Sequence, residues 1–134
     1  MISQPPLEGI LETCVYANDL EAAERFYRDV IGLDVYAKMD GRHVFFRCGA
    51  CMFLVFNPET TVVKGTPFPV HGAVGPGHAA FEVLPESLDA WRARLGDAGV
   101  SIETEIDWPN GGHSIYFRDP AGNSIELATR QTWS

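Results

Sequence analysis

Residues 116–127 read YFRDPAGNSIEL, and this stretch predicts a hairpin formed by the last two strands of the fold. Two segments rich in β-branched and aromatic residues flank DPAG at 119–122, and Asp-Pro-x-Gly is typical of a tight turn. Side chains alternate along a strand, so Ile125 and Leu127 face one side of the sheet and Glu126 faces the other. A carboxylate between two large apolar residues either faces solvent or points toward a ligand.

The same pattern occurs earlier in the chain. FFRCGACMFLVF at 45–56 resembles the final stretch, and both contain Phe-Arg just before the turn. ETCVYANDLEAAERFY near the start resembles HAAFEVLPESLDAWRARL, which begins at residue 78. The chain therefore contains two copies of a strand, a helix and about three strands. We predict one α+β domain with a first module over about 8–57 and a second over about 77–130.

The first predicted helix lies within NDLEAAERFYRDVIG, with Asn18 as N-cap, Glu21 as its capping-box partner and Gly32 at its end. Residues 57–77 contain four prolines and four glycines, which argues against any regular element there. This loop contains the linker at about 58–76. Long loops of this kind inside a compact domain are usually functional lids or linkers.

Composition excludes several function classes. The 134 residues have a formal charge of −8, so the chain lacks the basic surface of a nucleic-acid-binding protein. No apolar run approaches the ~20 residues that span a bilayer. No signal peptide is recognised at the N-terminus. The odd number of cysteines, three, argues against a secreted disulfide scaffold, so we expect a cytoplasmic protein.

Each predicted helix can cover only one face of its sheet. The apolar alternate residues belong under the helices, whereas the opposite faces mix small and polar residues, as the lining of a cleft would. Glu12 and His78 begin the first strand of each module, and Glu126 lies in the last strand, all three on uncovered faces. Two carboxylates and an imidazole suit a divalent ion of Fe, Mn, Ni, Co or Zn.

The sequence resembles the vicinal oxygen chelate superfamily. That group includes glyoxalase I, fosfomycin-resistance thiol transferases, extradiol dioxygenases and bleomycin-resistance proteins. The resemblance is carried by NDLEAAERFYRDVIGL, GHAAFEV and YFRDPAGNSIEL, and it extends over nearly the whole chain. It implies two βαβββ modules that form a U-shaped mixed sheet around a cleft, usually in a homodimer whose site draws on both chains.

The resemblance also implies roles for individual residues. Glu12, His78 and Glu126 fall on the metal-ligand positions, and Phe53 falls where glyoxalase I has a fourth ligand. Tyr116, ten residues before the last ligand, is expected near the substrate. The implied function is a metal-dependent enzyme acting on a small substrate with adjacent oxygens, with Glu12, Glu126 and Tyr116 in catalytic roles. A lyase or isomerase, a thiol transferase and a dioxygenase all stay open.

Several residues have simpler interpretations. A dioxygenase needs a further histidine, and His71 and His113 are available but lie off the expected spacing. The Cys48-x-x-Cys51 motif spans a predicted hairpin rather than a helix N-terminus, so we interpret its thiols as small strand residues.

A metal-free binding protein of the bleomycin-resistance type is the alternative function. Its basis is the acidic charge together with Trp91, Trp108 and Trp133, which would stack on a cationic ligand. His78 and Glu126 favour the enzyme over this alternative.

Overall fold

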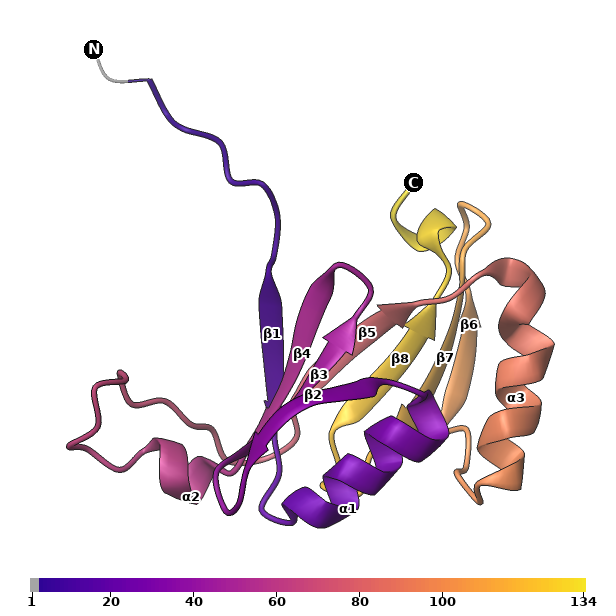
Figure 1. Ribbon diagram of the computed structural model, residues 1–134. Helices are drawn as coiled ribbons and strands as arrows, with labels where there is room; N and C mark the ends of the chain where they lie inside the picture. Colours follow the sequence, from indigo (N-terminus) through magenta and orange to yellow (C-terminus); the bar gives the residue numbers. More distant parts are fainter. Residues whose placement is uncertain (1–2) are drawn as a thin grey trace.

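The computed structural model describes residues 3–134, which form two four-stranded mixed sheets flanked by helices (Figure 1). The first sheet has the order β1-β4-β3-β2 and the second has the order β5-β8-β7-β6. The strands are β1 (Glu12–Tyr16), β2 (Asp34–Met39), β3 (His43–Cys48), β4 (Cys51–Phe56), β5 (His78–Glu82), β6 (Thr104–Asp107), β7 (His113–Arg118) and β8 (Ser124–Ala128). The helices are α1 (Leu20–Arg25), η1 (Phe26–Ile31), α2 (Pro58–Thr61), η2 (Pro85–Ser87), α3 (Leu88–Asp97) and η3 (Arg130–Trp133).

The two sheets have the same topology, which confirms the predicted repeat and the α+β class. In each, the first strand pairs in parallel with the fourth strand of its module, and the remaining neighbours are antiparallel. The registers also correspond, because Glu12 lies opposite Met52 in the first sheet and His78 lies opposite Ser124 in the second.

The N-cap prediction for the first helix is wrong by one residue. Asp19 is the N-cap, and its carboxylate accepts a hydrogen bond from the backbone N–H of Ala22 at 3.0 Å. Asn18 instead donates its side-chain amide to Glu59 at 3.0 Å, which ties this turn to α2. The helix continues as the π-helical η1 and ends at Gly32, which has the positive φ of 88° expected for a helix terminator.

Strand β2 and helix α2 were not located from the sequence pattern, nor was the C-terminal η3. Strand β2 (Asp34–Met39) is mostly exposed and contains a register shift between Val35 and Ala37, so it lacks a clear apolar alternation. The short helix α2 lies inside the loop that was expected to have no regular element. Its N-cap is Asn57, which accepts from the N–H of Glu59, and proline occupies its first turn, where a missing N–H costs nothing.

One hydrophobic core lies between the helices and the helix-facing sides of both sheets. Val15, Ala79, Ile125 and Leu127 are buried in it, as the alternation predicted. Tyr27 of η1 is fully buried, with its ring 4.9 Å from that of Phe53. Because this core is shared, the opposite faces of the two sheets are left for other contacts.

The turn at 119–123 links the two modules. Asp119 is buried and accepts the hydroxyl of Tyr27 at 2.6 Å and the side-chain amide of Asn123 at 2.9 Å. Its other oxygen accepts two backbone N–H groups within the turn. Asn123 also donates to the carbonyl of Tyr16 and accepts from the N–H of Gly77. The predicted turn therefore also fastens η1 and β1 to the second sheet.

The N-terminal stretch runs away from the body of the chain as an extended segment (Figure 1). Leu7, Ile10 and Leu11 in it are 95, 78 and 72% exposed. The connection after α2 also projects outward and carries exposed apolar residues, among them Phe68 and Val74. Among residues 3–134, no helix combines the length and apolar character that crossing a bilayer requires.

Candidate functional site

His78 and Glu126 meet on the second sheet, on the face turned away from the core. The Nε2 of His78 lies 3.3 Å from Oε1 of Glu126, and their side chains are 52% and 10% exposed. The Nδ1 of His78 lies 2.9 Å from the carbonyl oxygen of Ser124, which can only accept, so Nδ1 donates. In the neutral ring, Nε2 therefore presents a lone pair to a carboxylate oxygen. A cation between these two atoms would relieve that opposition.

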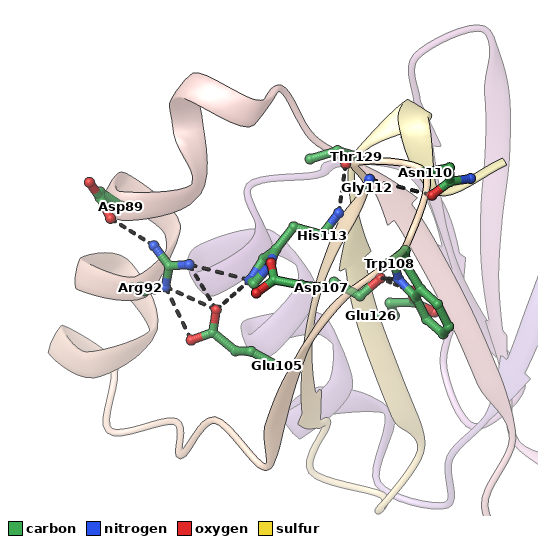
Figure 2. A network of polar contacts seen from close by, with 11 residues as sticks. Asp89, Arg92, Glu105, Asp107, Trp108, Asn110, Gly112, His113, Glu126 and Thr129 are labelled. Atoms are coloured by element: carbon green, nitrogen blue, oxygen red, sulfur yellow. Dashed lines mark hydrogen bonds and ion pairs between the residues drawn. The ribbon is translucent and has the colours of Figure 1, made fainter. Parts of the chain in front are cut away.

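Glu126 is held from its other side by a chain of two hydrogen bonds (Figure 2). The hydroxyl of Ser114 donates to Oε2 of Glu126 at 2.5 Å, and the indole N–H of Trp108 donates to the Ser114 oxygen at 2.9 Å. Ser114 is fully buried, and Glu126 is 7% exposed. One carboxylate oxygen is thus fixed by the protein, while the other faces His78.

Tyr116 lies beside this pair. It is directly opposite Glu126 in the β7–β8 register, and its ring stacks toward that of His78 at a centroid distance of 6.5 Å. Burial, and then the neighbouring Glu126 carboxylate, raises the pKa of Tyr116, so the phenol keeps its proton at neutral pH. Three of the predicted site residues are therefore gathered on one face.

Glu12 lies on the first sheet, apart from this group. Its side chain is exposed on the face of β1 that is turned away from the core, in one cross-strand row with Met52 and Arg47. Within residues 3–134, no three His, Cys, Asp or Glu side chains are close enough together to hold a metal ion. A single chain therefore supplies two of the three predicted ligands as a pair, and the three-ligand site stays a prediction.

The comparisons with known proteins agree with this architecture. The family model for the Glyoxalase/Bleomycin resistance protein/Dioxygenase superfamily matches residues 9–127, which include both modules. The chain belongs to this superfamily.

Three of its relatives carry the names of enzymes. Metallothiol transferase FosB of Bacillus licheniformis is 30% identical over 90% of this chain and 75% of its own length. Catechol-2,3-dioxygenase of Bacillus subtilis is 31% identical over 85% of this chain, but over only 40% of its own length. The crystal structure of lactoylglutathione lyase from Agrobacterium tumefaciens is 44% identical, with a TM-score of 0.93 over 97% of this chain and 99% of that one.

The β4 register shows which residue of the first module occupies the position equivalent to Glu126, where glyoxalase I has its fourth metal ligand. Glu126 lies opposite Ala80, and the corresponding pair in the first module is Leu54 opposite Cys14. Phe53, the position predicted from sequence, is 2% exposed and points into the core, so that assignment is wrong by one residue. The cause is the turn before the last strand, which is one residue longer in the second module. The conclusion holds, because leucine also lacks a metal-binding group.

The two further histidines have structural partners. His113 lies between Glu105, at 2.6 Å from Nε2, and Asp107, at 2.7 Å from Nδ1 (Figure 2). The hydrogen bond to Glu105 is the main reason that the pKa of His113 is raised. His71 contacts the hydroxyl of Tyr16 at 2.6 Å. Neither histidine joins His78 and Glu126, which argues against a role as the additional histidine of a dioxygenase.

The Cys48-x-x-Cys51 motif holds free thiols across the β3–β4 turn. Burial, and then the neighbouring Cys51, raises the pKa of Cys48, which disfavours the reactive thiolate. The thiol of Cys51 donates to the backbone carbonyl of Ile10 at 3.2 Å. These contacts support the interpretation of both cysteines as strand residues.

The residues on the second sheet also fit a divalent metal. Two donors bound to one ion at about 2.0–2.2 Å lie roughly 3.0–3.5 Å apart, and the facing atoms of His78 and Glu126 are at 3.3 Å. Metal-binding histidines typically donate their other ring N–H to a carbonyl, as His78 does to Ser124. Sequence reasoning missed Ser114, and it assigned Trp108 to ligand stacking rather than to the support of Glu126. Alternation along β7 could have placed Ser114 on the face of Tyr116.

Proposed function

We propose that the protein is a divalent-metal-dependent enzyme acting on a small substrate with two adjacent oxygens. The metal, one of Fe, Mn, Ni, Co or Zn, would be held by His78 and Glu126 of one chain and Glu12 of a partner chain in a homodimer. The observation that carries the proposal is the His78–Glu126 pair, in which Nε2 and Oε1 lie 3.3 Å apart and each side chain is oriented by a second hydrogen bond.

Two observations support a partner chain. The side chain of Glu12 is exposed on a sheet face that its own second module does not cover. The N-terminal stretch that leads into β1 leaves Leu7 and Ile10 almost fully exposed, which is costly for a chain that acts alone. A second copy that placed its Glu12 beside His78 and Glu126 would complete the ligand set and cover these residues.

The protein residues have distinct tasks in this proposal. A bound metal ion would act as a Lewis acid toward negative charge on the substrate oxygens. The Tyr116 phenol, kept protonated by its surroundings, would donate a hydrogen bond to one of those oxygens. Ser114 holds one oxygen of Glu126, so that carboxylate keeps a fixed orientation. Where the reaction moves a proton, Glu12 or Glu126 would carry it.

The geometry favours a lyase, an isomerase or a thiol transferase over a dioxygenase. His71 and His113 are engaged elsewhere, which counts against a dioxygenase. The β4 strand presents Met52 and Leu54 to the cleft rather than a fourth ligand, which counts against the four-ligand arrangement of glyoxalase I but not against a three-ligand lyase or transferase. The 30% identity to a metallothiol transferase supports a thiol transferase. The extensive similarity to a lactoylglutathione lyase structure keeps that reaction type equally open.

The alternative, a metal-free protein that sequesters a cationic ligand, has less support. Trp91 packs on the core from α3, Trp108 donates to Ser114, and Trp133 is 91% exposed near the C-terminus. Two of the three indoles have partners within residues 3–134 and the third is exposed, and none of the three stacks on another, so they form no common platform for a cationic ligand.

Metal analysis of protein purified without chelators tests the proposal. We expect about one ion per chain in the wild type and strongly reduced content in His78→Ala and Glu126→Gln. Glu86→Gln, at an exposed position, is the matched control and should retain the metal. Wild-type protein that takes up no divalent ion from solution would overturn the proposal.

Mixing two inactive variants tests whether the site is shared. A Glu12→Gln chain retains its own His78 and Glu126, and a Glu126→Gln chain retains Glu12. Random reassociation would restore about one quarter of the sites, because half of the dimers would be mixed and each would have one intact site. Metal binding of the mixture no higher than that of the parents would refute a shared site, while binding by Glu12→Gln alone would remove Glu12 from the ligand set.

A further inference from the structure

The cleft-facing side of the first sheet contains a cavity of about 990 Å³. Its floor is apolar and is formed by Phe45, Leu54 and Phe56 from adjacent strands. Phe68 from the loop after α2 borders it on the outside. The apolar floor of this cavity differs from the corresponding face of the second sheet, where the polar residues His78, Tyr116 and Glu126 lie.

Two arginines border the cavity without a carboxylate partner among residues 3–134. The guanidinium of Arg42 lies 5.4 Å from the ring centre of Phe56 and 5.3 Å from that of Phe68. The guanidinium of Arg47 lies 4.5 Å from the ring centre of Tyr36. The chain has 18 acidic and 10 basic residues, and two of its cations lie on this one cavity without an ion pair to any residue that the structure describes.

The second module provides an internal comparison. Arg118 occupies the position equivalent to Arg47, since Arg118 lies opposite Ser124 and Arg47 lies opposite Met52. Arg118 is neutralised by Glu103, with contacts of 3.0 and 3.2 Å. Arg47 forms no such ion pair, although Asp34 lies opposite it on β2. The same residue is therefore paired in one module and free to bind an anion in the other.

The remaining polar groups of the cavity leave its charge positive. His43 stacks on Phe45 at 3.9 Å and lies 2.8 Å from a guanidinium nitrogen of Arg42. Burial, and then the charge of Arg42, lowers the pKa of His43, so its ring is neutral at pH 7. Glu12 is the one carboxylate among the residues that line the cavity. Two permanent cations thus face a single anion, and the proposed function would commit that anion to the metal.

We infer that this cavity binds an organic anion with an aromatic or branched apolar body, whose carboxylate or sulfonate group pairs with Arg47 or Arg42. The inference rests on the proposed function for its catalytic meaning, since the bound molecule would then be the substrate. Glu12 and Arg47 lie in one cross-strand row, two strand spacings or about 10 Å apart. A molecule of one or two rings spans that distance from the ligand residue to the guanidinium.

Two fluorescent probes that differ in one group test the inference on metal-free protein. 1-Anilinonaphthalene-8-sulfonate carries a sulfonate, and N-phenyl-1-naphthylamine is the same ring system without it. We expect the sulfonate probe to bind about tenfold more tightly, with an affinity that falls as salt is added. 1-Naphthoate should displace it, whereas 1-naphthylmethylammonium should not.

Arginine variants assign the site. Arg47→Gln or Arg42→Gln should reduce sulfonate binding by about tenfold and leave the neutral probe unchanged, while the paired Arg118→Gln should leave both unchanged. Equal binding of the two probes, or wild-type sulfonate affinity in both Arg42→Gln and Arg47→Gln, would overturn the inference. Because no metal is present, this result is independent of the metal analysis, and either proposal can fail while the other stands.

Discussion

Replacing Ser114 by alanine removes the link between Trp108 and Glu126. The hydroxyl of Ser114 is fully buried, donates to a carboxylate that is 7% exposed, and accepts from the indole N–H. Alanine leaves the Glu126 oxygen without its donor and the indole without its acceptor. Hydrogen bonds to charged groups contribute about 1.5–3 kcal/mol, and Trp108 is exposed enough to find water, so we expect a loss of about 2–3 kcal/mol in unfolding free energy.

Urea unfolding followed by tryptophan fluorescence measures this loss at fixed protein concentration. The slope of the transition should stay unchanged, because the substitution removes one hydroxyl and no elements. Affinity for Mn²⁺, measured by calorimetric titration, should also fall about 10- to 100-fold, since Glu126 loses the contact that orients it.

Ser101→Ala, at an exposed position outside the helices and strands, is the matched control and should change neither quantity. A Ser114→Ala protein within about 0.5 kcal/mol of the wild type would refute the energetic reasoning. A stability loss with unchanged Mn²⁺ affinity would show that Ser114 supports the fold without positioning the ligand.

Three further changes test the fold. Tyr27→Phe should lower the unfolding free energy by about 1–3 kcal/mol, because it removes a hydrogen bond to a buried carboxylate. Burial raises the pKa of Tyr27 above its unfolded value of 10.0, so the wild type loses stability above pH 10, and the variant should lose less. Protonated His113 contributes its full stabilisation below its unfolded pKa of 6.5, and this contribution is lost as the pH rises through its raised folded pKa. The unfolding free energy of His113→Gln, measured by urea denaturation at several pH values, should lack this pH dependence. Gly112→Ala would place a Cβ 2.3 Å from the Thr132 nitrogen and should cost about 1–3 kcal/mol by calorimetry, whereas Gly96→Ala in open space should not.

Much of the fold could be predicted because its signals are local. The strand alternation around Ile125 and Leu127, the turn at 119–122 and the glycine that ends η1 depend on few neighbours, and the structure confirms them. Asp19 displaced Asn18 as the N-cap because the Asn18 amide has a partner 41 residues away, which no local pattern reveals. The strand β2 was missed because exposure removed its apolar alternation.

The sequence identified individual site residues and the sheet face they share, but not all the contacts between them. His78, Tyr116 and Glu126 could be placed on one face from alternation and the repeat, and they lie together. The β4 position equivalent to Glu126 was assigned to Phe53 instead of Leu54, because the turns of the two modules differ in length by one residue. A shift of one residue along a strand moves a side chain to the opposite face of the sheet. Trp108 acts on Glu126 through Ser114, a contact that depends on how a loop folds back rather than on strand periodicity.

The fastening at the 119–123 turn has a consequence for how the chain folds. The hydroxyl of Tyr27 and its acceptor Asp119 are 92 residues apart in sequence, and Asn123 reaches the carbonyl of Tyr16 across 107 residues. These hydrogen bonds cannot form until the turn at 119–123 has been synthesised, so η1 and β1 lack these contacts until the end of translation. The first repeat is consequently not an independent folding unit, even though its topology is complete by residue 56. The two halves of the duplicated chain acquire their final structure as one cooperative unit.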